Sequence, residues 1–180
     1  FRNTQNDQIA GNQLKEIINL SKKTKSLVIP LMRRIDNSNI IEHAAIVRGF
    51  DQRNLQDKTI GPEIAKYLQQ RLNLISNIAE KNWIAEYSKN SIILKRTIRG
   101  FTEKFTIDEN FIVTPEARAL NEIRDQLMEN FYRLKENGSG VIENKNEQFK
   151  IYGPLDLINK ILEIGKSGIQ INRYKGLGEM

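Results

Sequence analysis

The first 80 residues of the chain repeat their apolar positions every three or four residues, which is the spacing of an amphipathic α-helix. Residues 1–8 are polar, and we expect them to be frayed. The pattern then predicts four helices, whose apolar stripes are Leu14, Ile17 and Ile18; Leu27, Leu31 and Ile35; Ile40, Ile41, Ala44 and Ala45; and Ile64, Leu68, Leu72 and Ile75. Pro30 lies inside the second stripe. Because proline is unfavourable in a helix interior, a kink at Pro30 or a helix that begins there is expected.

Several helix ends are marked by residues with capping chemistry. Asn37 or Ser38 is predicted to cap the third helix, and Gly49 is predicted to end it. The pair Gly61-Pro62 is predicted to open the fourth helix, since proline is favoured in a first turn. The intervening residues 50–59 are predicted to form a charged loop.

After Asn77 the apolar period changes to two, which indicates β-strands. Three strands are predicted, over residues 83–87, 91–99 and 102–107. The apolar face of the second strand carries Ile92, Leu94 and Ile98. Arg96 interrupts that face, so this strand is predicted to lie near an edge or an open side. A small antiparallel sheet with one apolar face needs a cover.

A helix from Pro115 to about Lys135 is predicted to supply this cover, because Thr114 can cap it and apolar residues line one side. Its stripe is Leu120, Ile123, Leu127, Phe131 and Leu134. A loop or weak hairpin over residues 141–152 is predicted next. It is followed by a helix that begins at Pro154 and ends at Ser167-Gly168, and by a strand from Ile169.

These elements predict an α+β fold with a helical N-terminal part, a small antiparallel sheet covered by a long helix, and a C-terminal helix and strand. The expected organisation is a helical part over residues 1–80, an α+β part over residues 81–168, and a terminal strand and glycine turn over residues 169–180.

The formal net charge of +6 favours a polyanionic partner, because the basic residues cluster. Residues 1–36 and 81–113 hold most of the excess positive charge. The candidate phosphate contacts in these segments are Lys22, Lys23, Arg33, Arg34, Lys95 and Arg99. The alternative is a solvated basic surface, and the test between the two is whether these side chains share one face.

Catalytic and metal-binding patterns are absent from the sequence. There is no cysteine, no phosphate-binding loop and no Asp-x-Asp pair, and the single histidine, His43, is expected to be a surface or half-buried polar residue. No apolar run approaches the ~20 residues that span a bilayer, so no membrane partner is expected, and the lack of cysteine suits a cytoplasmic protein.

The last eight residues, RYKGLGEM, form the most distinctive stretch. Arg173 and Lys175 alternate at the end of the last predicted strand, so both can point to one side. Gly176 and Gly178 remove two Cβ atoms, which lets the backbone turn and bring its N–H groups close to an anion. On spacing alone, a strand with a solvated glycine turn is an equal alternative.

This motif resembles the signature of the B subunits of bacterial type II topoisomerases, in particular those of DNA gyrases. In that family the motif lies in the metal-binding TOPRIM domain, close to the DNA that is cut, and many members carry a long insertion that ends where the motif resumes. The preceding residues are similar to that insertion in length and order of elements. Asn172 departs from the glutamine that is usual in the family, which puts in doubt any contact that needs the longer side chain.

The resemblance implies a piece of an ATP-hydrolysing topoisomerase that binds Mg²⁺ and ATP outside this chain and assembles as A2B2 with an A subunit. It implies that Arg173, Lys175, Gly176 and Gly178 contact the phosphate backbone of double-stranded DNA, while the chain alone holds no catalytic residue and is inactive. The chain opens with Phe1 and stops within the motif, and we expect it to be a fragment. A structural or subunit-contacting insert is the alternative role, and topoisomerase IV is the alternative parent.

Overall fold

The computed structural model describes residues 6–9, 11–134, 138–144, 147–164 and 169–174. It divides into two compact units. Unit 1 comprises residues 1–26 and 125–180, and unit 2 comprises residues 27–124. The domain boundaries expected after residues 80 and 168 therefore fall inside unit 2 and unit 1, respectively.

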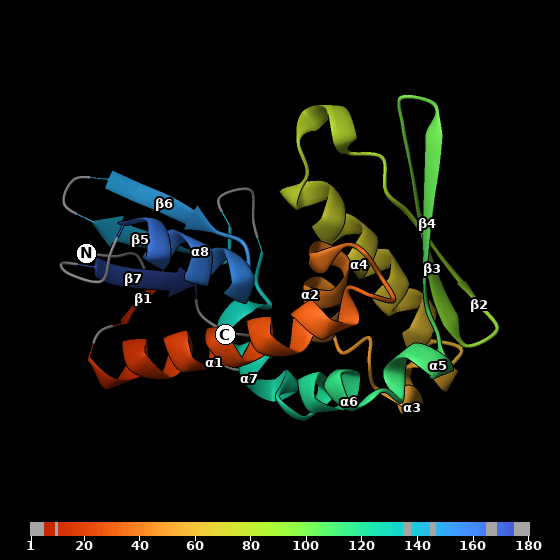
Figure 1. Ribbon diagram of the computed structural model, residues 1–180, viewed down its shortest axis with the longest axis horizontal. Helices are drawn as coiled ribbons and strands as arrows, with labels where there is room; N and C mark the ends of the chain where they lie inside the picture. The colour runs from red at the N-terminus through yellow and green to blue at the C-terminus, as the bar shows by residue number, and fades with distance from the viewer. Residues whose placement is uncertain (1–5, 10, 135–137, 145–146, 165–168, 175–180) are drawn as a thin grey trace. The chain divides into compact units, whose positions relative to one another are not determined.

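Unit 1 is built on a four-stranded antiparallel sheet with the order β1-β7-β5-β6 (Figure 1). The strands are β1 (Asn6–Ile9), β5 (Gly140–Asn144), β6 (Glu147–Ile151) and β7 (Ile169–Tyr174). The helices are the first part of α1 (Asn12–Leu31), α7 (Arg124–Phe131) and α8 (Pro154–Ile164), of which α8 packs on β6. The register joins Asn6 to Tyr174, so β1 and β7 bring distant parts of the chain together.

Several C-terminal elements are confirmed. The weak hairpin is β5 and β6, the helix that begins at Pro154 is α8, and the last strand is β7, whereas the expected stop at Ser167-Gly168 lies outside the described residues. The expectation of a frayed start is wrong for residues 6–8, because they pair with β7 as part of β1, which satisfies their backbone groups.

The first two predicted helices are one helix, α1, of 20 residues. It passes through Pro30 and ends one residue later, so neither a helix boundary at Pro30 nor a separate second helix exists. Pro30 lacks the N–H that would donate to the Ser26 carbonyl, so it costs a helical hydrogen bond, and the helix ends one residue later. Burial of Val28 and Leu31 offsets that cost.

Unit 2 begins with the end of α1 and continues through further helices, of which the sequence predicted some and missed others. They are α2 (Ser38–Ile46), α3 (Gln52–Gln56), α4 (Ile60–Ile75), η1 (Ile78–Glu80), α5 (Glu109–Ile112) and α6 (Pro115–Glu122). The Asn37 side chain accepts a hydrogen bond from the Ile40 N–H at 3.2 Å, which confirms this residue as the N-cap. Residues 50–59 were predicted as a loop but contain α3, which Asp51 caps through the Arg53 N–H.

The three predicted strands are confirmed to within about a residue as β2 (Ile84–Ser88), β3 (Ser91–Ile98) and β4 (Phe101–Ile107). The turn between β2 and β3 is Lys89-Asn90, and both residues have positive φ, 51° and 59°. The turn between β3 and β4 is Arg99-Gly100, at 52° and 85°. Such two-residue turns match the twist of the strands that they join, and they fix the antiparallel register.

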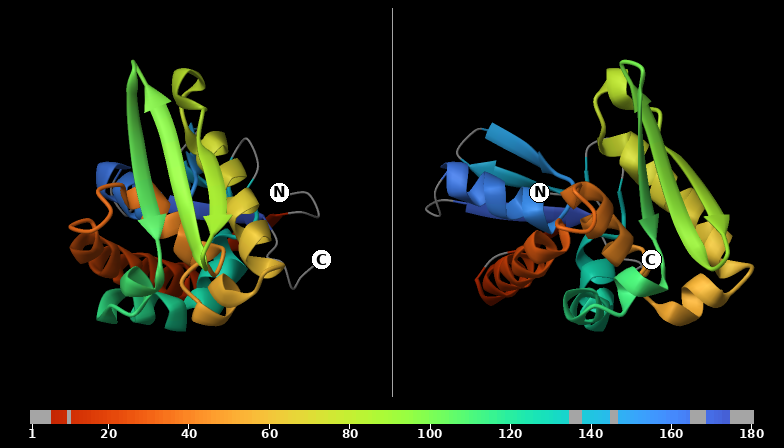
Figure 2. Two further views of the ribbon diagram at one scale, coloured as in Figure 1. Left: turned by 90° about the vertical axis from the view of Figure 1, so that its right-hand side faces the viewer. Right: turned by 45° about the vertical axis from the view of Figure 1, so that its right-hand side comes forward.

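The sheet is covered by α4 and not by the helix predicted from Pro115 to Lys135, so that packing prediction is wrong (Figure 2). That predicted helix is two, α6 and α7, which meet at Ile123 and belong to different units except for Arg124. Its apolar stripe is continuous because both halves are buried, but α6 packs on α2 and α5. The α+β fold class itself is confirmed.

The contact of α4 with the sheet is close at its first turn. A Cβ built at Gly61 would lie 2.2 Å from Cε1 of Tyr87, so only glycine lets the ring of this β2 residue approach the helix. The Tyr87 hydroxyl then donates to the Leu55 carbonyl at the end of α3. Leu68 and Leu72 of α4, together with Ile92 and Leu94 of β3, are almost completely buried and form the apolar core of this packing.

Candidate nucleic-acid interface

Strand β7 leads directly into the glycine motif. Arg173 lies on β7, where the register pairs its backbone with Asp7 of β1 and Gly140 of β5. The strand is therefore internal to the sheet and is held on both sides. Lys175, Gly176 and Gly178 lie outside the described residues.

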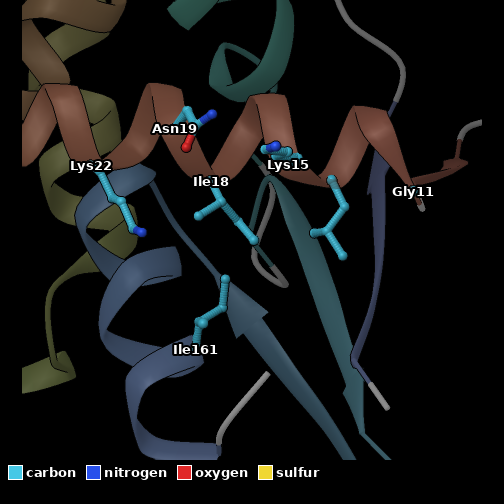
Figure 3. A pocket seen from close by; sticks show the side chains of 7 residues that line it. Gly11, Lys15, Ile18, Asn19, Lys22 and Ile161 are labelled. Atoms are coloured by element: carbon cyan, nitrogen blue, oxygen red, sulfur yellow. The ribbon is translucent and has the colours of Figure 1, made fainter. Parts of the chain in front are cut away.

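Unit 1 also carries exposed lysines on α1. Lys15 and Lys22 are seven residues apart on one side of the helix, and Lys23 is exposed next to Lys22. Lys15 and Lys22 border a groove of about 340 Å³ between α1 and α8 (Figure 3). Its apolar wall comprises Leu14, Ile18 and Ile161. The sequence placed Lys15, Lys22 and Lys23 on the exposed side of this helix, but only Lys22 and Lys23 were predicted as phosphate contacts.

The remaining basic candidates lie in unit 2. Arg33 and Arg34 are exposed in the turn after α1, and Arg99 is exposed in the turn between β3 and β4. Lys95 is half-buried on β3, and its Nζ lies 3.5 Å from Oε1 of Glu86. The six candidates are thus divided between the two units, two in unit 1 and four in unit 2, and no single unit gathers them all.

Lys104, on β4, is a basic residue that the sequence analysis passed over. It lies directly opposite Lys95 in the ladder, on the face of the sheet away from Leu94 and Phe105. Beside this pair, the hydroxyls of Thr97 and Thr102 are 3.0 Å apart. Alternation along β4 could have identified Lys104, because its parity differs from that of Phe105.

Arg96 has a structural role in spite of its position on the apolar face. Strand β3 is central in the order β2-β3-β4, so the prediction of an edge is wrong. The Arg96 guanidinium lies over the Trp83 ring, 4.3 Å from its centroid, and Nη2 lies 3.0 Å from Oε2 of Glu103. Stacking on an aromatic face and a carboxylate partner allow this charge to be mostly buried.

His43 is buried, which contradicts the expected surface or half-buried position. Its Nδ1 lies 3.2 Å from Nε and 3.1 Å from Nη2 of Arg71, and Arg71 also donates to the Tyr67 hydroxyl. Because arginine has only donors, Nδ1 is the acceptor and the imidazole is neutral. The pKa of His43 is held well below its usual value, mainly by burial and to a smaller extent by the charge of Arg71.

The described part of the chain contains no group of three or more His, Asp, Glu or Cys side chains that could hold a metal ion. None of its helices is long and apolar enough to cross a bilayer. The side chains described here can therefore supply positive charge and hydrogen-bond donors to a ligand, but they do not form a carboxylate site for Mg²⁺.

The fold is that of an α+β chain whose described basic side chains are divided between two units. Its relatives are B subunits of DNA gyrase. The one from Caulobacter vibrioides (strain NA1000 / CB15N) is 34% identical over 110 residues, which are 61% of this chain and 13% of that relative. The gyrase B subunits of Rickettsia prowazekii and Rickettsia conorii are 29% and 27% identical over 179 and 178 residues, in each case 97% of this chain and 21% of the relative.

The resemblance inferred from the motif is thus confirmed, and the chain is related to the B subunits of DNA gyrases along nearly its whole length. No protein-family model matches it. The chain spans only about one fifth of the Rickettsia relatives that it matches.

Proposed function

We propose that this chain is an accessory segment of a DNA gyrase B subunit, inserted in its TOPRIM domain, that contacts the phosphate backbone of double-stranded DNA. The parent enzyme is an ATP-driven type II topoisomerase of the cytoplasm that changes DNA supercoiling. It works with an A subunit, in an A2B2 assembly, and the A subunit carries the nucleophilic tyrosine. The names of the relatives support gyrase over topoisomerase IV as the parent.

The observation that carries this proposal is the pairing of β1 with β7 beside the glycine motif. Asn6 and Tyr174 are partners in the ladder, so the segment between them begins and ends at the same place in the sheet. A segment whose two ends are neighbours can be inserted into a host domain at little cost to the host fold. Strand β7, at the end of this segment, contains Arg173 and leads into Lys175.

In this role the chain positions DNA and does not read its sequence. Arg173 and Lys175 would neutralise backbone phosphates, and Gly176 and Gly178 would let the main chain approach them. Lys15, Lys22 and Lys23 are exposed in the same unit as β7 and would extend the positive surface. Mg²⁺ and ATP would be bound by other parts of the parent enzyme, because this sequence lacks their motifs.

The proposal is tested by Lys175→Ala in the full-length B subunit assembled with its A subunit. Loss of one phosphate contact should weaken binding about equally for all duplex sequences. It should also reduce the slope of log K against log salt by about 0.9. Lys66→Ala is the matched control, because Lys66 is an exposed lysine of α4 outside the proposed contact set, and it should change neither quantity.

Unchanged affinity and salt slope in Lys175→Ala would remove this lysine from the interface. If the combined Lys15→Ala, Lys22→Ala and Lys23→Ala variant also bound DNA normally, the segment would be a structural or subunit-contacting insert. The outer edge of β4, which has no backbone partner among the described residues, favours an additional contact with a protein.

A further inference from the structure

The three-stranded sheet of unit 2 has two outer strands, β2 and β4, and each turns every second peptide group outward. The pair Ile98–Phe101 closes the turn between β3 and β4 and is therefore hydrogen-bonded. Alternation from this pair directs the N–H and C=O groups of Glu103 and Phe105 toward β3. The same groups of Thr102, Lys104 and Thr106 face away from the sheet.

The outer edge of β2 is covered by side chains of α4. The Ala85 N–H donates to Oε1 of Gln69 at 2.8 Å, and the Trp83 N–H donates to Oδ1 of Asn73 at 2.9 Å. The Asn73 amide in turn donates to the Trp83 carbonyl at 3.2 Å. Two amide side chains thus take the place of a fourth strand, and this edge is closed to other chains.

The outer edge of β4 has no such cover from the part of the chain that the structure describes. Within the described residues, no helix or loop makes backbone hydrogen bonds with the outward groups of Thr102, Lys104 and Thr106. The strand runs for seven residues without proline or a bulge. At its start, the Phe101 side chain is 79% exposed, on the same face as the half-buried Phe105. An open edge beside exposed apolar surface is a template for another strand.

The charge on the opposite face indicates which strand fits. Lys104 and Lys95 are direct cross-strand neighbours, and like charges in such positions destabilise a sheet. Glu86 lies beside Lys95, 3.5 Å from its Nζ, on the far side from β4. A carboxylate on a strand added next to β4 would stand opposite Lys104 and relieve this repulsion.

We propose that the outer edge of β4 binds an extended segment of a partner protein by β-strand addition. The segment alternates apolar and acidic residues. Its apolar side chains cover Phe101 and Phe105, and an acidic side chain lies opposite Lys104. This contact is separate from the proposed binding of DNA and does not depend on it.

A second copy of this chain is a poorer occupant of the edge. Lys104 is the middle residue of β4. Antiparallel pairing of two copies with the greatest overlap would therefore place Lys104 opposite Lys104 of the other copy, which repeats the repulsion. A heterologous acidic strand removes it.

The test uses the 180-residue chain and a synthetic blocked peptide of seven residues in which valine and glutamate alternate. Amide hydrogen exchange is followed by NMR. Saturating peptide should slow the exchange of Thr102, Lys104 and Thr106 amides at least tenfold, and it should leave Glu103 and Phe105 unchanged, because these are already bonded to β3. A control peptide with lysine in place of glutamate should bind at least tenfold more weakly.

Three substitutions at Lys104 distinguish the contribution of the backbone edge to peptide binding from the contribution of the lysine charge. Lys104→Pro removes the outward N–H without breaking a ladder bond to β3, since proline is tolerated on edge strands, and it should raise the Kd at least tenfold. Lys104→Thr keeps the edge and should weaken binding only a few-fold. Lys104→Glu should reverse the preference between the two peptides. The melting temperature of each variant confirms that it is folded.

Four results would overturn the proposal. The first is that peptide leaves the amide exchange of Thr102 and Thr106 unchanged, and the second is that peptide protects these amides equally well in Lys104→Pro. The third is that raising the protein concentration protects them without peptide. The fourth is that a short DNA duplex protects them more strongly than peptide does. The third would assign the edge to self-association and the fourth to nucleic acid.

Discussion

At the scale of single residues, surroundings that are distant in sequence determine what a polar side chain does. Arg96 is accommodated on an apolar face because Trp83 and Glu103 lie against its guanidinium. His43 is neutral because it is buried against Arg71, 28 residues further along the chain. Neither partner could be assigned from the local pattern.

The buried histidine makes stability depend on pH in a defined window. The pKa of His43 is lowered in the folded chain, whereas in the unfolded chain it is about 6.5. Below that pH the unfolded state takes up a proton that the folded state excludes. The free energy of unfolding should therefore be constant above pH 6.5. Below it, the free energy should fall by as much as about 1.4 kcal/mol per pH unit.

The measurement is urea denaturation between pH 5 and pH 8, because His43 is the single histidine of the chain. His43→Gln is the control, since its amide oxygen can still accept from Arg71 but does not titrate. It should flatten the part of the curve between about pH 5 and 6.5 that is due to the histidine. An identical slope in this variant would exclude His43 as the cause.

At the scale of elements, α4 has two roles in unit 2. Its apolar side, with Leu68 and Leu72, is buried beneath the sheet, and its amides Gln69 and Asn73 close the edge of β2. The helical stripe in the sequence predicted that this side is apolar, but the sequence analysis assigned the cover of the sheet to a different helix. The second role depends on the register of helix against strand, which no helical pattern contains.

Asn73 should contribute more to stability than its half-buried position suggests. Asn73→Ala leaves both the N–H and the C=O of Trp83 without their partner, so the free energy of unfolding should fall by about 1–3 kcal/mol. Gln70→Ala, at the exposed position next to Gln69, is the control and should change it by less than about 0.5 kcal/mol.

Trp83 provides a local probe of the same edge, because it is the single tryptophan and is buried. Its emission should shift to longer wavelength in Asn73→Ala as water reaches the strand. Wild-type stability and emission in that variant would show that the Asn73 side chain does not protect this edge from water.

At the scale of the whole molecule, each unit has its own sheet and its own buried side chains. Ile142, Ile151 and Leu157 are buried in unit 1, and Ile92 and Leu94 are buried in unit 2. The chain enters unit 2 within α1, after Ser26, and leaves it at Arg124. Unit 2 is therefore a continuous stretch enclosed in sequence by the two parts of unit 1.

Separate cores predict separate responses to acid. His43 lies in unit 2, so lowering the pH from 7.5 to 5.5 should lower the amide protection factors, which are corrected for the pH dependence of intrinsic exchange, within residues 27–124 more than those in β5, β6 and β7. Hydrogen–deuterium exchange followed by mass spectrometry measures both parts at once. The difference between the two units in their response to acid should disappear in His43→Gln. An equal loss of protection in both units would show that they open as one cooperative body.

The sequence by itself determined the elements whose signals are local. The three strands over residues 83–107, a helix cap at Asn37 or Ser38 and the helical stripe of α4 depend on neighbours a few residues away, whereas the turn residues Arg99-Gly100 and the choice of Asn37 came from the structure. The motif that ends in Met180 identified the relatives, because eight consecutive residues carry that resemblance without any structure. The proposed contacts of Arg173 and Lys175 with DNA stay predictions.

Only the tertiary structure decided how these elements combine. The stripe from Leu120 to Phe131 is continuous in sequence, yet α6 and α7 serve different units, because each half buries its apolar side against different partners. The polar segment Asn6–Ile9 is a strand because β7 supplies its hydrogen bonds from the other end of the chain. Burial of apolar surface and pairing of backbone groups are satisfied over long sequence separations, and local periodicity carries no record of which partner satisfies them.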